Sequence, residues 1–128
     1  MIKIAIDLDG TINASKQSIE FFSVLTHLLI AEHSRIYIIT DREPNTEQNV
    51  ADELDYLGIE YSAIIITDKK AEYIKEHGIT IFFENQDESF LELSEEEATV
   101  FKIRENMNYS FSERKWIGSK KTVRMIDD

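Results

Sequence analysis

Residues 2–11 read IKIAIDLDGT, and this stretch decides how the chain folds. A short run of β-branched apolar residues predicts a strand that is buried on both faces. The run leads directly into Asp7 and Asp9, which are followed by Gly10. Carboxylates at the end of a buried strand cost free energy unless a cation or a hydrogen-bond donor receives them. The two acids therefore either cap the next segment or hold a cation and take part in chemistry.

Apolar runs of the same kind alternate with segments of helical periodicity along the rest of the chain. Strands are predicted over 2–7, 35–40, 62–67, 79–83 and 99–103. Helices are predicted over 18–33, within 44–58, and over 68–78 and 88–93. In the second helix, Asn45 and Gln48 offer a capping box and Gly58 a C-terminal stop. Four of the strands lack the polar alternation of a solvated sheet, so the order predicts an α/β fold with a mostly parallel five-stranded sheet and helices on both faces.

Length and charge limit the functions that this chain can have. Its 128 residues are enough for a single domain, with a core over roughly 1–103 and a C-terminal extension over 104–128 that forms a strand or an irregular tail. A net charge of −11 argues against nucleic acid and anionic membranes as partners. The chain has no cysteine and shows neither a signal peptide nor an apolar run of the ~20 residues that span a bilayer. We therefore expect a cytoplasmic protein.

Polar and charged residues follow the first four predicted strands, at the edge where open parallel sheets bind ligands. They are Asp7, Asp9, Thr40, Arg42, Asp68, Lys69, Lys70, Glu84 and Asn85. Each has an ordinary explanation, such as a helix cap at Asp68, a solvated side chain at Lys69, or a capping box from Asn85 to Glu88. Those explanations do not account for the convergence of all of them on one edge. Carboxylates suit Mg²⁺, and a nucleophile with nearby cations and donors suits phosphoryl transfer.

Four motifs in order resemble the haloacid dehalogenase (HAD) superfamily of phosphohydrolases. They are DLDGT after a buried strand, IIT at the end of the second strand, a lysine opening a helix, and an acidic position after FF. The resemblance covers roughly residues 1–103. It implies a three-layer HAD-type Rossmannoid fold that hydrolyses phosphate monoesters with Mg²⁺ through an aspartyl-phosphate. The expected substrate is a small phosphorylated metabolite or a nucleotide.

The resemblance also assigns roles to the site residues. Asp7 would be the nucleophile, and Asp9 the general acid and then the general base. Thr40 would hydrogen-bond a phosphoryl oxygen. Lys70, which fits the motif better than Lys69, would hold the nucleophile and the charge of the phosphate.

Substrate and metal ligands are implied in the same way. Gly10 and Thr11 would shape the loop at the phosphate, and the fork of Arg42 could bind a substrate phosphate or carboxylate. Mg²⁺ would be held by a set of four residues: Asp7, Asp9, Glu84 and Asn85.

The chain departs from the family pattern at the metal site. The acidic pair after the fourth strand is usually two aspartates, but here it reads Glu84-Asn85. Glutamate still supplies a carboxylate, whereas Asn85 keeps an oxygen and loses a charge, which predicts a lower metal affinity. The alternative to an active phosphatase is therefore a catalytically weak or inactive metal-binding, phosphate-binding or regulatory domain.

A second departure concerns the cap domain with which most relatives cover small substrates. The segments after Thr11 and after Thr40 leave no room for such an insertion, so we expect a capless type with an open site. A second copy of the chain could cover it as a homo-oligomer. The basic residues of the extension could also fold over it, or form only a solvated surface; they are Arg114, Lys115, Lys120, Lys121 and Arg124.

Overall fold

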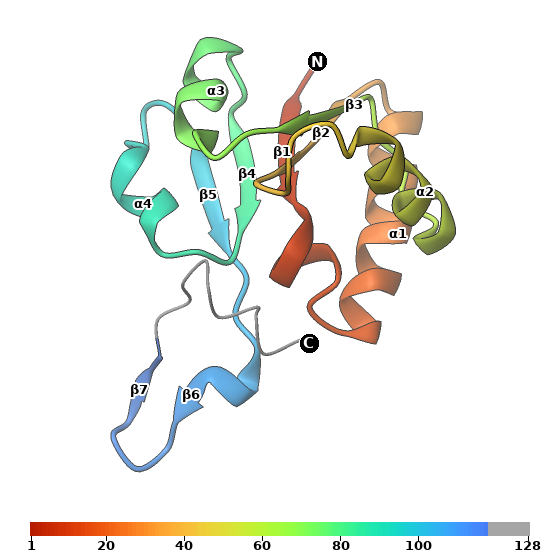
Figure 1. The fold of residues 1–128 in the computed structure, drawn as a ribbon. Coiled ribbons are helices and arrows are strands. Elements are labelled where there is room, and N and C mark those ends of the chain that lie inside the picture. Colours follow the sequence, from red (N-terminus) through yellow and green to blue (C-terminus); the bar gives the residue numbers. More distant parts are fainter. Residues whose placement is uncertain (118–128) are drawn as a thin grey trace.

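The computed structural model describes residues 1–117, and an open five-stranded sheet lies at its centre (Figure 1). Its strands are β1 (Lys3–Asp7), β2 (Arg35–Thr40), β3 (Ala63–Ile66), β4 (Ile81–Glu84) and β5 (Thr99–Lys102). They lie in the order β3-β2-β1-β4-β5, and every neighbouring pair in this sheet is parallel. The predicted α/β fold with a parallel five-stranded sheet is confirmed.

Helices cover both faces of the sheet, which gives the expected three layers (Figure 1). They are α1 (Lys16–Ala31), α2 (Glu47–Leu57), α3 (Lys70–Glu76) and α4 (Glu88–Glu92). One core cluster joins β1 and β2 to Phe22 of α1 and Leu54 of α2. A second cluster joins the opposite face of the same strands to Ile74 of α3.

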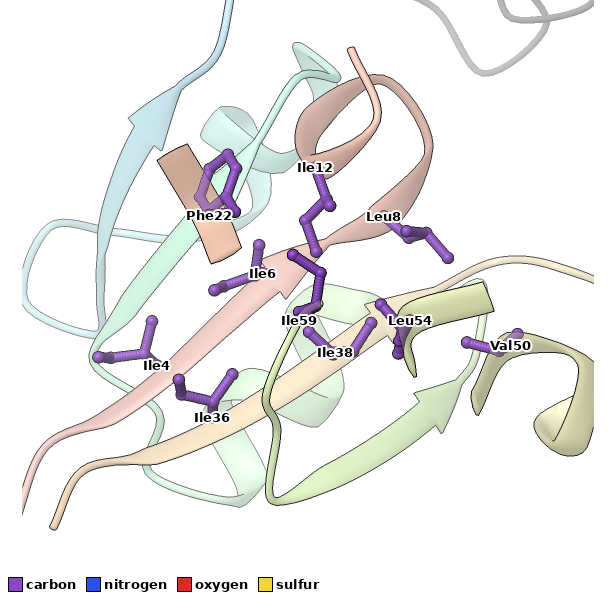
Figure 2. Packing of buried hydrophobic residues seen from close by; sticks show 10 residues of the cluster. All are labelled: Ile4, Ile6, Leu8, Ile12, Phe22, Ile36, Ile38, Val50, Leu54 and Ile59. Carbon is purple, nitrogen blue, oxygen red and sulfur yellow. The ribbon is translucent and has the colours of Figure 1, made fainter. Parts of the chain in front are cut away.

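The side chains of β1 alternate between these two clusters. Ile4 and Ile6 belong to the α1–α2 side and Ala5 to the α3 side, as the two-residue period of a strand requires. Figure 2 shows ten buried side chains of the first cluster, contributed by β1, β2, α1, α2, the turn after β1 and the segment after α2. Ala5 and Ile6 are fully buried, so both faces of β1 exclude water. This explains why its sequence lacks polar alternation.

The helix starts differ from two predictions. Helix α1 begins at Lys16 rather than at residue 18, because the Ser15 side chain accepts a hydrogen bond from the Ser18 N–H at 3.1 Å and caps the helix. The prediction of a capping box at Asn45 and Gln48 is wrong, since α2 begins at Glu47 with no side-chain cap. The Gln48 amide instead donates to Asp52 one turn later, at 2.8 Å. Gly58 ends α2 in the left-handed conformation, as predicted.

A short antiparallel hairpin follows the sheet. Its strands are β6 (Tyr109–Ser110) and β7 (Lys115–Trp116). Arg114 and Lys115 belong to this hairpin, whereas Lys120, Lys121 and Arg124 lie outside the described residues. Within residues 1–117, no helix is long and apolar enough to cross a membrane.

Candidate active site

The end of β1 lies at the point where the order of the strands in the sheet reverses. The chain adds β2 and β3 on one side of β1, then returns to add β4 and β5 on the other. Asp7 is the last residue of β1 and Glu84 the last residue of β4. Parallel α/β sheets bind ligands at such a switch point. The predicted site residues therefore meet at the expected edge.

Lys70 connects the ends of these two strands. Its Nζ atom donates to Asp7 Oδ1 at 2.6 Å and to Glu84 Oε2 at 3.3 Å. The side chains of all three residues are almost completely buried. Lys69, the other candidate lysine, is exposed and is the residue that precedes α3. The structure thus brings Lys70, and not Lys69, to the nucleophile candidate.

Two carboxyl groups share one ammonium group at this point, so the cluster has an excess of negative charge whenever both acids are ionised. Burial raises the pKa of Asp7, Lys70 opposes this shift and Glu84 adds to it, which together place the pKa at about 8. Burial alone would lower the pKa of Lys70, but the carboxylates of Asp7 and Glu84 outweigh it and raise this pKa above its ordinary value. A bound cation would neutralise the remaining charge.

The turn after β1 depends on Gly10. This residue has a φ of 82°, and a Cβ built on it would lie 2.3 Å from Asn85 Nδ2. Its N–H donates to Asn13 Oδ1 at 2.8 Å. The Thr11 hydroxyl donates to Asp7 Oδ2 at 3.1 Å, so both oxygens of the Asp7 carboxylate have a donor from the protein. The glycine therefore allows β1 and the segment after β4 to approach closely.

Glu84 is held by four donors. Its Oε1 atom accepts the N–H groups of Asn85 and Gln86 at 2.8 and 3.3 Å. Its Oε2 atom accepts hydrogen bonds from Lys70 Nζ and from the Ser89 hydroxyl, the latter at 3.2 Å. A carboxylate has about four lone-pair positions, so Glu84 would have to release a donor before it could bind a metal ion directly. Sequence reasoning missed Ser89, for which no motif gives a signal.

Two buried side-chain oxygens among the described residues lack a hydrogen-bond partner: Thr40 Oγ1 and Asn85 Oδ1. Thr40 is fully buried at the end of β2, one residue beyond Ile39, the register partner of Asp7. Leaving a buried polar group without a partner costs about 1–3 kcal/mol, so these oxygens are suited to a ligand.

The groups at this edge that could hold a metal ion are oxygens of carboxylates and of an amide. No group of three or more histidine or acidic side chains within the described part of the chain is arranged to hold a metal ion. Mg²⁺ commonly takes one or two carboxylates and keeps several waters. The Asp7 carboxylate and the amide oxygen of Asn85 are hard ligands of the right kind.

Asp9 is fixed by Arg42 rather than by the buried lysine. Arg42 donates from Nε to Asp9 Oδ2 at 2.9 Å and from Nη2 to Asp9 Oδ1 at 2.8 Å. On its other side, Arg42 binds Glu53 of α2 through Nη1 at 2.8 Å and Nη2 at 3.2 Å. The hydrogen bond to Asp9 raises the pKa of Arg42 even though burial opposes the shift. A substrate anion would have to displace one of these carboxylates to reach the fork of Arg42.

The ordinary explanations for two of these positions are not observed. The N-cap of α3 is Lys69, whose N–H donates to the Thr67 hydroxyl oxygen at 3.0 Å, so Asp68 is not the cap. No side chain caps α4, which follows Asp87, so Asn85 and Glu88 form no capping box. Asp68 and Glu88 instead line an open cavity of about 410 Å³ beside Lys70.

The central strand β1 ends at Asp7, the first residue of DLDGT. The strand that ends at Thr40 lies on one side of it and the strand that ends at Glu84 on the other, as the motifs predict. The fold is a Rossmann-like α/β fold.

Solved structures similar to this chain are three mutant forms of a thermostable p-nitrophenylphosphatase, or NPPase. Two, a single and a double mutant, are from Geobacillus stearothermophilus, and the third is described as from Bacillus stearothermophilus. Each shares 24% identity with a TM-score of 0.47, over 77% of this chain and 41% of the other. The chain thus spans less than half the length of these structures. No protein-family model and no curated protein sequence matches it.

Proposed function

We propose that this chain is a HAD-type phosphatase that hydrolyses phosphate monoesters with Mg²⁺ through an aspartyl-phosphate on Asp7. The observation that carries this proposal is the buried contact of 2.6 Å between Lys70 Nζ and Asp7 Oδ1 at the switch point of the sheet. A buried carboxylate held by a lysine, beside the buried Thr40 hydroxyl that has no partner, is suited to receive a phosphoryl group.

In the first step, an oxygen of the Asp7 carboxylate attacks phosphorus, and the bond between phosphorus and the leaving oxygen breaks. Asp9 gives its proton to that oxygen, so the alcohol leaves neutral. Lys70 and the Thr40 hydroxyl bind the phosphoryl oxygens, on which charge accumulates. The products of this step are the alcohol and the phosphorylated Asp7.

In the second step, a water molecule attacks the same phosphorus atom. Asp9, now ionised, takes a proton from the water, and the bond between phosphorus and the Asp7 oxygen breaks. Inorganic phosphate leaves, and both aspartates return to their initial states. Lys70 again stabilises the Asp7 carboxylate as its charge returns.

Bound Mg²⁺ would neutralise part of the phosphate charge and help to align it for attack. Asp7 and Asn85 would hold it, with Asp9 and Glu84 as the further ligands implied by the resemblance. The role of Glu84 in metal binding stays a prediction, since its four donors also fit a role in holding Lys70.

A small phosphorylated metabolite or a nucleotide remains the best candidate for the substrate, and a second copy of the chain remains a candidate lid. The alternative function is metal or phosphate binding without turnover. It is favoured by Asn85, which supplies an oxygen ligand but no charge.

Hydrolysis of p-nitrophenyl phosphate tests the proposal. The purified protein would be assayed with Mg²⁺ and with EDTA, alongside Asp7→Asn and the exposed control Asp55→Asn on α2. We expect turnover that needs Mg²⁺, that is lost in Asp7→Asn and that is retained in Asp55→Asn. A folded protein that binds Mg²⁺ but turns over neither this substrate nor a panel of phosphorylated metabolites would favour the binding module instead.

A further inference from the structure

Arg42 joins the proposed general acid to a helix of the scaffold. The Arg42 side chain is only 25% exposed, and it lies between the carboxylates of Asp9 and Glu53. Four hydrogen bonds of 2.8 to 3.2 Å connect the three residues. Glu53 belongs to α2, whereas Asp9 lies in the turn after β1.

The geometry of these bonds fixes the orientation of the Asp9 carboxylate. The guanidinium group is planar and its donors form a rigid fork. Nε and Nη2 both bind Asp9, while Nη1 and Nη2 bind Glu53, so the two carboxylates occupy two edges of one plane. Asn13 adds a bond from Nδ2 to Asp9 Oδ1 at 3.1 Å. Without Glu53, Arg42 would keep only its contact with Asp9, and the two side chains could move together.

We propose that Glu53 is a positioning residue for Asp9, acting through Arg42. The inference rests on the proposed function, because it concerns the step in which Asp9 transfers a proton to the leaving oxygen. It assigns to α2 a role in the reaction beyond covering the sheet. It also assigns the fork of Arg42 to a carboxylate of the protein rather than to the substrate.

Such a role has a signature that a purely structural role lacks. An alkoxide needs a proton from Asp9 in order to leave, whereas p-nitrophenolate is stable as an anion and leaves without one. A misplaced Asp9 therefore slows the first step, which kcat/KM reports, more for an alkyl phosphate than for p-nitrophenyl phosphate. The second step, in which Asp9 acts as the base, is the same for both esters. Loss of the fold would reduce both rates by the same factor.

The experiment compares Glu53→Gln and Glu53→Ala with Asp52→Asn, which changes the preceding, exposed residue of α2. We would measure kcat and KM for p-nitrophenyl phosphate and for glycerol 2-phosphate, together with the unfolding temperature of each variant. General acid catalysis contributes roughly 10²–10⁴-fold, so partial loss of alignment in Glu53→Gln should lower kcat/KM on glycerol phosphate by about tenfold. We expect a larger loss in Glu53→Ala, little change in kcat/KM on the nitrophenyl ester, and wild-type behaviour in Asp52→Asn.

Three outcomes would overturn the inference. Equal losses of kcat/KM on both esters would make Glu53 a structural residue. A raised KM with an unchanged kcat would make Arg42 a substrate ligand. A folded wild-type protein that hydrolyses neither ester in Mg²⁺ would remove the proposed function, and this role would fall with it. Only the third outcome affects the wild-type protein, so the two failures are distinguishable.

Discussion

Lys70 Nζ lies 2.6 Å from Asp7 Oδ1, although the two residues are 63 positions apart in the chain. The contact is buried, and Lys70 Nζ also donates to Glu84, the last residue of β4. The strand order, in which β1 lies between β2 and β4, brings these residues together.

Replacing Lys70 should destabilise the protein as well as abolish turnover. Lys70→Ala leaves Asp7 and Glu84 buried beside each other with no cation between them. Removal of one partner from a buried ion pair typically costs about 3–5 kcal/mol in the free energy of unfolding. Lys69→Ala alters the exposed neighbour and should change it by less than about 0.5 kcal/mol. Urea denaturation of both variants measures the difference, and equal values would contradict the buried contact.

Gly10→Ala should disturb the site through Asn85. The substitution imposes a side chain on a residue with a φ of 82° and places its Cβ against the Asn85 amide. Gly78→Ala is the matched control, because Gly78 has a φ of 63° but nothing lies within 4 Å of its added Cβ. Both variants should lose about 1 kcal/mol of stability to backbone strain. Only Gly10→Ala should also weaken Mg²⁺ binding, as measured by calorimetry; equal Mg²⁺ affinities in the two variants would count against the role of Asn85.

The stability of the metal-free protein should fall as the pH rises. The pKa of Asp7 is raised from 3.8 in its ordinary state to about 8 in the folded protein, so the folded state binds the proton more tightly than the unfolded state does. This contribution is complete below the lower value and is lost progressively up to about 8. Unfolding temperatures in EDTA between these limits should therefore show a downward trend, and Asp7→Asn should flatten it. An upward trend in the wild-type protein would refute the assignment.

A charge restored at position 85 should strengthen metal binding. Asn85→Asp adds a third carboxylate near Asp7 and Glu84, so we expect about tenfold tighter Mg²⁺ binding, the factor that corresponds to 1.4 kcal/mol. The metal-free variant should be less stable, because the added charge has no cation. Asn106→Asp, at an exposed position outside the sheet, is the control. Isothermal titration of Mg²⁺ into each protein measures the change, and identical affinities would remove Asn85 from the metal site.

The sheet could be predicted because each of its strands carries its own signal. A strand buried on both faces appears as a continuous apolar run, and β1 with Ala5 and Ile6 fully buried is such a strand. Helix ends were harder to predict, since a cap depends on which partner a side chain chooses. Gln48 has a cap position within reach in sequence, yet it binds Asp52 on its own helix. Residue spacing allows both partners and does not show which of them Gln48 chooses.

The residues of the candidate site likewise fall into those that the sequence predicts and those that it does not. Asp7, Thr40 and Glu84 were predictable because parallel strands bring their ends to one edge, whatever the details of packing. Glu53 and Ser89 were not, because each acts through one side-chain contact that depends on where a helix settles on the sheet. An acid on an amphipathic helix ordinarily indicates only a solvated face.

Because β1 lies in the middle of the sheet, the site is complete only when the two halves of the chain have come together. A fragment that ends after β3 would contain Asp7, Asp9 and Thr40, but neither the lysine nor the glutamate that complete the buried charge cluster. The complementary fragment would contain Lys70 and Glu84 without Asp7. Under the proposed function neither piece would be active alone, so any activity that returns on mixing them would measure how far the two halves have docked along β1 and β4.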